Sequence, residues 1–103
     1  MGDQRLQPSE RLRHRRDYQR VFESGTKQVA PVFVLYVLPT LGPHSRLGIA
    51  VSKHIGNAVV RNRVKRRTRE FFRRHKAQLD PPCDLVVVAR RRAAEAPYTE
   101  YAQ

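Results

Sequence analysis

The chain has 103 residues, 40% of them hydrophobic, and a formal net charge of +12. This length allows one domain with a modest core and leaves no room for a second. The charge excess makes a polyanion the expected partner, with nucleic acid first and an anionic membrane second. Arginine far outnumbers lysine, a bias that suits RNA or DNA and that GC-rich codon usage would explain equally well.

The cysteine and histidine content argues against a disulfide framework and against a zinc site. Cys83 is the single cysteine, and the four histidines match no zinc-ligand spacing. The beginning of the chain lacks the apolar core of a secretory signal, and no apolar run is long enough to cross a bilayer. We therefore expect a cytoplasmic protein without a membrane association.

The domain organisation is simple. Residues 1–8 are expected to form a disordered lead-in, and residues 9–103 a single domain, because no linker rich in proline or glycine divides the chain. The end of this domain, from Ala93 onward, is expected to begin another helix after Pro97.

The first predicted element is a helix that begins at Ser9 or Asp17 and ends before Gly25. Tyr18 and Phe22 share one face of this helix, since they are four residues apart. Arginines surround this aromatic pair in the sequence, so the helix combines stacking groups with positive charge.

Three short apolar runs predict strands, at residues 32–38, 47–52 and 85–89. The third run does not alternate with polar residues, which indicates a strand buried on both faces. The second run alternates between large and small side chains. Its small residues are Gly48, Ala50 and Ser52. Another group can therefore approach that face closely.

A long helix is predicted between the second and third strands, from about Ala58 to Lys76, with Asn57 as its cap. At about 100° per residue, apolar side chains gather on one side as a buried stripe. The stripe consists of Val60, Val64, Thr68 and Phe71. A different side carries the polar and basic residues Asn62, Lys65, Arg66, Arg69 and Arg73.

The charge of this helix is the strongest functional signal in the sequence. Nine Lys or Arg lie between Arg61 and Lys76, against Glu70 alone. A solvated helix face is the alternative explanation, but such faces normally mix both signs in Glu–Lys pairs. Like charges four residues apart destabilise a helix, so the excess predicts a bound anion, with nucleic acid favoured.

Motifs of protein catalysis are missing from the sequence. It contains no nucleophile elbow, P-loop or zinc-protease motif, and its scattered carboxylates form no general acid–base pair. Asp84 precedes a predicted strand, where a structural role in a turn is expected rather than a catalytic one. We expect no catalytic residue and no metal ligand in the protein itself.

The stretch from Leu47 to Arg74, LGIAVSKHIGNAVVRNRVKRRTREFFRR, closely resembles the signature region of bacterial ribonuclease P protein subunits. The family's RNR motif is Arg61-Asn62-Arg63, preceded by AVSKHIGNAV. The helix RRDYQRVFESG and the strand FVLY also resemble the family at the expected spacing. The likeness therefore covers about residues 10–100.

The resemblance implies an α+β fold, an α/β sandwich of ribosomal-protein-S5-domain-2-like topology. Its small mixed sheet would contain a left-handed βαβ crossover through the basic helix, whereas general topology rules favour a right-handed one. Family members continue into a complete C-terminal helix. This sequence ends at Gln103, about one turn into that segment, so the helix is expected to be either incomplete or naturally short.

The resemblance also implies a function as the protein subunit of ribonuclease P. In the family, a catalytic RNA cleaves precursor tRNA at its 5′ end with bound Mg²⁺, and the protein helps to hold substrate and metal. The implied partners are the catalytic RNA and precursor tRNA, with no obligate protein partner. No cofactor would be bound firmly by the protein, and Mg²⁺ would be required by the holoenzyme.

Two sets of site residues follow from the resemblance. The catalytic RNA would contact Arg61, Asn62, Arg63, Lys65, Arg66, Arg69 and Arg73. The single-stranded 5′ leader would bind in a cleft at Tyr18, Phe22, Tyr36 and Lys53, because aromatic faces stack on unpaired bases of any sequence. Core packing is the alternative for the helix aromatics: for Phe22 the two interpretations stand even, whereas the hydroxyl of Tyr18 favours the cleft.

Other classes of protein compete with this interpretation. A ribosomal or architectural RNA-binding protein would use a similar basic helix. A binder of anionic membranes would need a large apolar face beside the basic one. An independent nuclease would need a cluster of carboxylates, which the sequence does not suggest.

Overall fold

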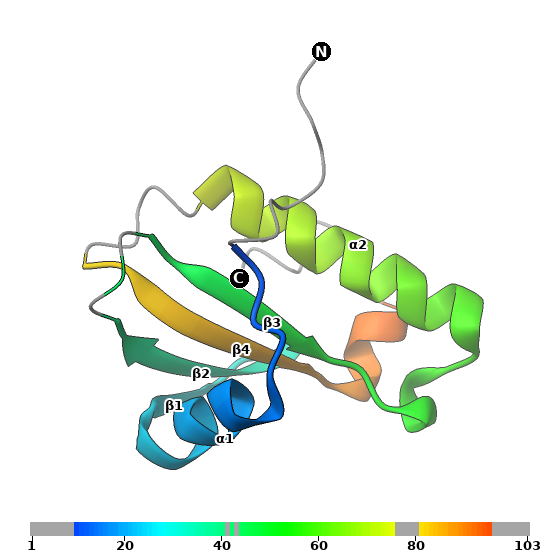
Figure 1. Cartoon of the computed structure of the whole chain (residues 1–103). Coiled ribbons are helices and arrows are strands. Elements are labelled where there is room, and N and C mark those ends of the chain that lie inside the picture. Colours follow the sequence, from blue (N-terminus) through cyan, green and yellow to red (C-terminus); the bar gives the residue numbers. More distant parts are fainter. Residues whose placement is uncertain (1–9, 41, 43, 76–80, 96–103) are drawn as a thin grey trace.

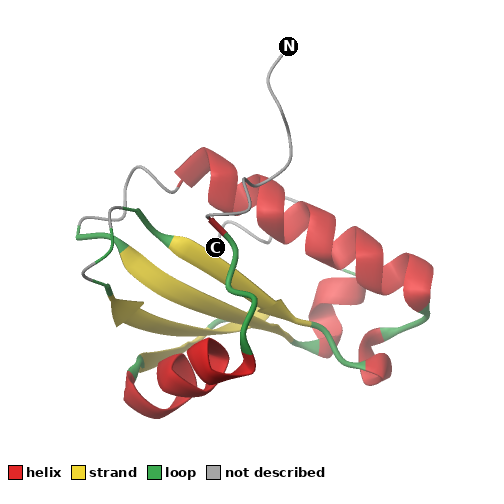
Figure 2. Ribbon diagram, in the orientation of Figure 1, coloured by secondary structure: helices red, strands yellow, loops and turns green. Residues whose placement is uncertain are grey.

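The computed structural model describes residues 10–40, 42, 44–75 and 81–95. The predicted lead-in and the helix predicted after Pro97 lie outside these residues. The helices and strands, shown in Figures 1 and 2, follow one another as α1 (Arg15–Ser24), β1 (Thr26–Val29), β2 (Phe33–Pro39), β3 (Arg46–Ala50), η2 (Lys53–Ile55), α2 (Ala58–His75), β4 (Cys83–Ala89) and η4 (Arg91–Ala94). The elements η2 and η4 are short 3₁₀ helices.

The four strands form one mixed sheet in the order β1-β2-β4-β3. Strands β1 and β2 pair antiparallel, as do β2 and β4, whereas β3 and β4 pair in parallel. Helix α2 connects the two parallel strands, so that β3, α2 and β4 form a βαβ unit. The predicted α+β sandwich with a small mixed sheet is confirmed.

The two long helices cover opposite faces of the sheet (Figure 1). On the face of α2, the larger core cluster includes Val64, Phe72 and Leu47. On the face of α1, a smaller cluster joins Leu12, Val21 and Val86. Because β4 supplies side chains to both clusters, it is buried almost throughout, as predicted for the third apolar run.

The buried stripe of α2 differs from the predicted one at two positions, because Val60 is half-buried and Phe72 takes the place of Phe71. The buried residues are Val64, Thr68 and Phe72, whereas Phe71 is half-buried and stacks on His75 with ring centroids 4.1 Å apart. Steps of four residues carry the stripe to position 72, since the side facing the sheet follows the i, i+4 direction. The Thr68 hydroxyl is satisfied within the helix, because it donates to the Val64 carbonyl at 2.8 Å.

The start of α1 was predicted at Ser9 or Asp17, and both positions are wrong: the helix begins at Arg15. The preceding segment is extended, and it pairs with the sheet instead. The Leu12 amide donates to the Leu47 carbonyl at 2.9 Å, and Arg11 forms a parallel bridge with Leu47. A backbone committed to a strand cannot also begin a helix, so tertiary pairing determines where α1 starts.

Strand β1 was not predicted. Its four residues are all exposed and do not alternate in hydrophobicity, so the pattern that reveals half-buried strands is missing. Backbone pairing with β2 holds β1, from Thr26 opposite Val37 to Val29 opposite Val34. The other three strands lie within two residues of their predicted bounds.

Helix α2, with 18 residues, carries basic side chains along its length. Across the residues that the structure describes, no helix is both long and apolar enough to span a membrane. In the same part of the chain, no three His, Cys, Asp or Glu side chains gather into a group that could hold a metal ion.

Candidate nucleic-acid interface

The basic face of α2 is built on a capped and anchored helix. Asn57 caps the helix as predicted: its Oδ1 accepts the Val60 amide at 3.0 Å. With the apolar stripe fixed against the sheet, the polar residues turn toward solvent. Asn62 and Arg66 are exposed. The half-buried members of the predicted set are Arg61, Arg63, Lys65, Arg69 and Arg73.

Part of the positive charge of α2 is compensated within the helix itself. Arg74 donates to Glu70 at 2.9 Å, one helical turn away. No such pair with a carboxylate is found for Arg66 or Lys65 within the described residues. The face can therefore offer unpaired cations to a polyanion.

An aromatic group lies on the opposite side of the sheet. Phe22 and Tyr36 meet edge to face, with ring centroids 4.8 Å apart. Phe22 is 41% exposed, which is unusual for a phenylalanine and leaves part of its ring open to a ligand. The structure thus brings together Phe22 from α1 and Tyr36 from β2, as the predicted cleft requires.

Tyr18 was expected to line the leader-binding cleft, but the structure places most of its side chain against the sheet. It is half-buried and packs against the smaller core cluster. Its ring lies on β3 at Gly48, where a β-carbon would be only 2.6 Å from the Tyr18 Cε1 atom. The prediction that another group approaches the small-residue face of this strand is confirmed, and the group is Tyr18 itself.

Lys53 is separated from this aromatic group by its position in the fold. It is exposed in η2, which follows β3 and packs against α2 and η4. No hydrogen bond or ring contact of the described residues joins Lys53 to Phe22 or Tyr36. A ligand would have to extend from the aromatic pair toward the end of β3 to reach it.

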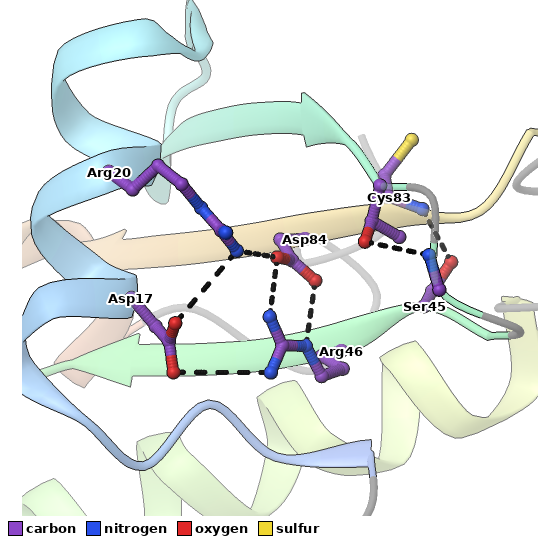
Figure 3. Close-up of polar contacts among 8 residues, drawn as sticks. Asp17, Arg20, Ser45, Arg46, Cys83 and Asp84 are labelled. Carbon is purple, nitrogen blue, oxygen red and sulfur yellow. Dashed lines mark hydrogen bonds and ion pairs between the residues drawn. The ribbon is translucent and has the colours of Figure 1, made fainter.

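An ion-pair cluster centred on a buried carboxylate fastens α1 to the sheet (Figure 3). Asp84 is fully buried, and both its oxygens accept hydrogen bonds from Arg46, at 3.0 and 2.8 Å. Arg20 of α1 donates to the same carboxylate at 2.8 Å. Asp17 lies 3.9 Å from each of these two guanidinium groups. The hydrogen bond to Asp84 raises the pKa of Arg46, against the opposing effect of burial.

The structural role expected for Asp84 is confirmed, but its place is not a turn. It lies within β4 and pairs with residues 64 and 38 positions away. A buried carboxylate needs such partners, because an uncompensated charge in the interior is strongly unfavourable. Neither Arg20 nor Arg46 could be recognised as these partners from sequence spacing alone.

The comparisons with known proteins agree with one another. A family model described as Ribonuclease P matches residues 6–103. The chain belongs to the ribonuclease P protein family. Among its relatives are the ribonuclease P protein component of Shouchella clausii, 43% identical over 92% of this chain and 79% of that one, and that of Syntrophobacter fumaroxidans, 47% identical over 86% and 76%.

Solved structures of the ribonuclease P protein family share the fold. The RNase P protein of Staphylococcus aureus is 37% identical, with a TM-score of 0.81 over 88% of this chain and 84% of that one. The RNase P protein of Thermotoga maritima is 35% identical, with a TM-score of 0.79 over 89% and 87%. The sandwich described above is therefore that of the ribonuclease P protein.

Within the RNR motif of this ribonuclease P family member, Arg63 has a contact that the sequence did not suggest. Its Nη2 donates to the Ala94 carbonyl at 2.9 Å. This bond joins α2 to η4, whereas Asn62 next to it is exposed. Arg63 thus holds the end of the described chain in place, and the role in RNA binding that was predicted for it stays a prediction.

Proposed function

We propose that the chain acts as the subunit of ribonuclease P that binds the catalytic RNA through the basic face of α2. It also binds the single-stranded 5′ leader of precursor tRNA at the aromatic group of α1 and β2. In this proposal the RNA subunit cleaves the leader with its own Mg²⁺ ions, and the protein contributes binding and orientation. We also propose that the protein acts in the cytoplasm, where tRNA processing is expected to take place.

The observation that carries the proposal is the placement of two different RNA-binding chemistries on opposite faces of one small sheet. The face of α2 offers guanidinium groups, which bind phosphates through paired hydrogen bonds. The other face offers a partly exposed phenylalanine against a tyrosine, a surface on which unpaired bases can stack. A protein with both can hold a structured RNA and a single strand at once.

Several features support the division of roles. Family membership supports an RNA partner. Stacking on aromatic rings tolerates any base, which suits leaders of varied sequence. Long-range attraction by a chain of charge +12 would increase the rate of association with RNA. A ribosomal or architectural RNA-binding protein would use the α2 face without needing the aromatic one.

Reconstitution with a bacterial ribonuclease P RNA tests the proposal. The experiment measures cleavage of precursor tRNA at limiting Mg²⁺ with and without the chain, for substrates that carry either a leader of several nucleotides or a single nucleotide. We expect the chain to increase cleavage efficiency, and to do so more strongly for the longer leader. An increase that is equal for both substrates would contradict leader binding, and no increase would contradict the proposed function as a whole.

A further inference from the structure

Two neighbouring rows of residues on the sheet face α1. One row runs across β2, β4 and β3 and consists of Tyr36, Val86 and Gly48. The other row lies two residues away on each strand and consists of Leu38, Asp84 and Arg46. Side chains two residues apart on a strand point to the same face, and α1 packs on this face through Val21 and Val86. The helix can therefore contact both rows at once.

Helix α1 makes an aromatic contact with the first row and an ion pair with the second. Phe22 meets Tyr36 edge to face, with ring centroids 4.8 Å apart. Arg20 donates to the Asp84 carboxylate at 2.8 Å (Figure 3). At about 100° per residue, Arg20 and Phe22 lie on either side of the buried Val21 around the helix axis. A rotation of α1 about its axis therefore changes both contacts together.

The carboxylate of Asp84 gives α1 a fixed point on the sheet. Of the ten residues of α1, all within the described part of the chain, Val21 alone is buried. Asp84 is fully buried, and Arg46 holds its two oxygens at 3.0 and 2.8 Å. An exposed ion pair contributes little because both side chains are mobile, but the carboxylate that Arg20 reaches is held in place. The pair therefore fixes one flank of the helix.

We infer that Arg20 is a positioning residue for leader binding, an inference that rests on the proposed function and deepens it. Through Asp84 it holds α1 at the rotation in which part of the Phe22 ring stays exposed beside Tyr36. Arg20 acts by keeping this stacking surface preorganised, so that an unpaired base binds without first ordering the two rings.

Arg20→Gln breaks the ion pair without leaving a buried charge unpaired, because Arg46 still donates two hydrogen bonds to Asp84. The control is Arg16→Gln, which removes the same charge from an exposed residue one turn earlier on α1. Among the described residues, Arg16 has no ion pair with a carboxylate. Circular dichroism verifies folding, and Arg20→Met, which keeps the apolar part of the side chain, replaces a glutamine variant that fails to fold.

NMR of the protein alone measures the arrangement of the two rings. Cross-peaks between Phe22 and Tyr36 and their ring-current shifts report the edge-to-face contact. We expect Arg20→Gln to weaken these cross-peaks and to move the ring signals, and Arg16→Gln to leave them as in the parent chain. Unchanged ring signals in a folded Arg20→Gln variant would overturn the inference.

Binding of precursor tRNA by the reconstituted holoenzyme is the second readout. We expect Arg20→Gln to weaken the binding of leader-bearing precursor about three- to tenfold, a part of what one stacked base contributes. Affinity for mature tRNA and the cleavage rate at saturating enzyme should stay unchanged, because neither depends on the leader surface. An equal loss in Arg16→Gln would show a general effect of charge and would contradict the inference.

A double-mutant cycle with Phe22→Ala separates positioning from direct contact between Arg20 and the leader. If Arg20 acts through Phe22, Arg20→Gln should have little further effect on precursor binding once the ring is removed. A full three- to tenfold loss in the Phe22→Ala background would show that Arg20 binds the leader itself, and the inference would be wrong.

The outcome is separable from that of the proposed function. If the parent chain favours the longer leader but Arg20→Gln behaves like Arg16→Gln in every assay, the positioning role is wrong and the proposed function stands. If the parent chain shows no preference for the longer leader while Arg20→Gln still shifts the ring signals, the proposed function is wrong and the role of Arg20 in orienting α1 stands.

Discussion

The ring of Tyr18 lies directly on the backbone of Gly48, so close that a β-carbon there would stand 2.6 Å from Cε1 and 2.9 Å from the hydroxyl oxygen. A glycine at this position of β3 is therefore a requirement for the position of α1 on the sheet. The small side chains on one face of β3 are visible in the sequence, and this contact shows that they make room for the Tyr18 ring of α1.

Gly48→Ala should displace the Tyr18 ring, because no real β-carbon tolerates a neighbour at 2.6 Å. We expect a loss of about 1–3 kcal/mol in unfolding free energy, as for other overpacked cores. Urea denaturation measures it. Gly42→Ala is the control, since a β-carbon there meets Thr40 Oγ1 at an ordinary 3.5 Å, and we expect a change within about 0.5 kcal/mol. Equal effects would show that Tyr18 moves aside freely.

Phe22→Ala should separate leader binding from general RNA binding. The exposed part of the ring can stack on an unpaired base, which is worth about 1–3 kcal/mol per base. Affinity of the holoenzyme for precursor tRNA should fall accordingly, while affinity for mature tRNA and for the catalytic RNA stays nearly unchanged. Val59→Ala, which shortens a side chain 74% exposed on α2, is the control. If the affinities for precursor and mature tRNA fell equally, Phe22 would have a packing role only and no role in leader binding.

Changing Arg66 and Arg69 together to Ala should weaken binding of the catalytic RNA by a few kcal/mol, about 1–2 for each charge-assisted contact. Folding should be retained, because neither residue belongs to the buried stripe of α2. Filter binding and circular dichroism measure the two effects. Arg74→Ala, which removes a cation already paired with Glu70, should have a smaller effect. Unchanged RNA affinity in a folded double variant would exclude this face.

The salt dependence of RNA binding reports how many phosphates the charge of +12 engages. Each neutralised phosphate should contribute a slope of roughly −0.7 to −0.9 to a plot of log K against log salt. The double variant at Arg66 and Arg69 should have a shallower slope than the parent chain. A parent slope near zero would show that the charge is not used on nucleic acid.

Asp84→Asn should destabilise the protein strongly, since it leaves the Arg46 guanidinium partly buried without its carboxylate. Leaving a fully buried charge unpaired costs about 3–5 kcal/mol. We expect a smaller loss here, about 2–3 kcal/mol, because the side chains of Arg46 and Arg20 are 30% and 51% exposed. Thermal or urea unfolding measures the effect. Glu70→Gln breaks an exposed pair on α2 and should change stability by no more than about 1 kcal/mol.

The sequence predicts those parts of the fold that depend on hydrophobic pattern and local capping. The buried strand β4, the Asn57 cap and the basic side of α2 follow from residue types at short spacing. Strand β1 could not be predicted, because its four exposed residues are held by backbone pairing with β2. The start of α1 depends on a hydrogen bond to Leu47, a residue far along the chain.

The candidate site shows the same division. The residue types were predicted, but their surroundings were not. Arg63 was grouped with the RNA-binding cations, and the structure gives it a bond to the Ala94 carbonyl. Arg11 was not selected at all, since a single arginine among several before α1 carries no local signal. Only the parallel bridge to β3 places it beside Lys65 and Arg69.

The pairing of Arg11 and Leu12 with Leu47 also bears on self-association. Strand β4 occupies one side of β3, so this short segment lies along the other side and occupies part of an otherwise open edge. Open strand edges are templates on which a second copy of a chain can add its own strand and begin to aggregate. At the opposite edge, β1 is only four residues long and bears the exposed charge of Lys27, two features that discourage such growth. Both edges of the sheet therefore offer a second copy of the chain little free backbone on which to add a strand.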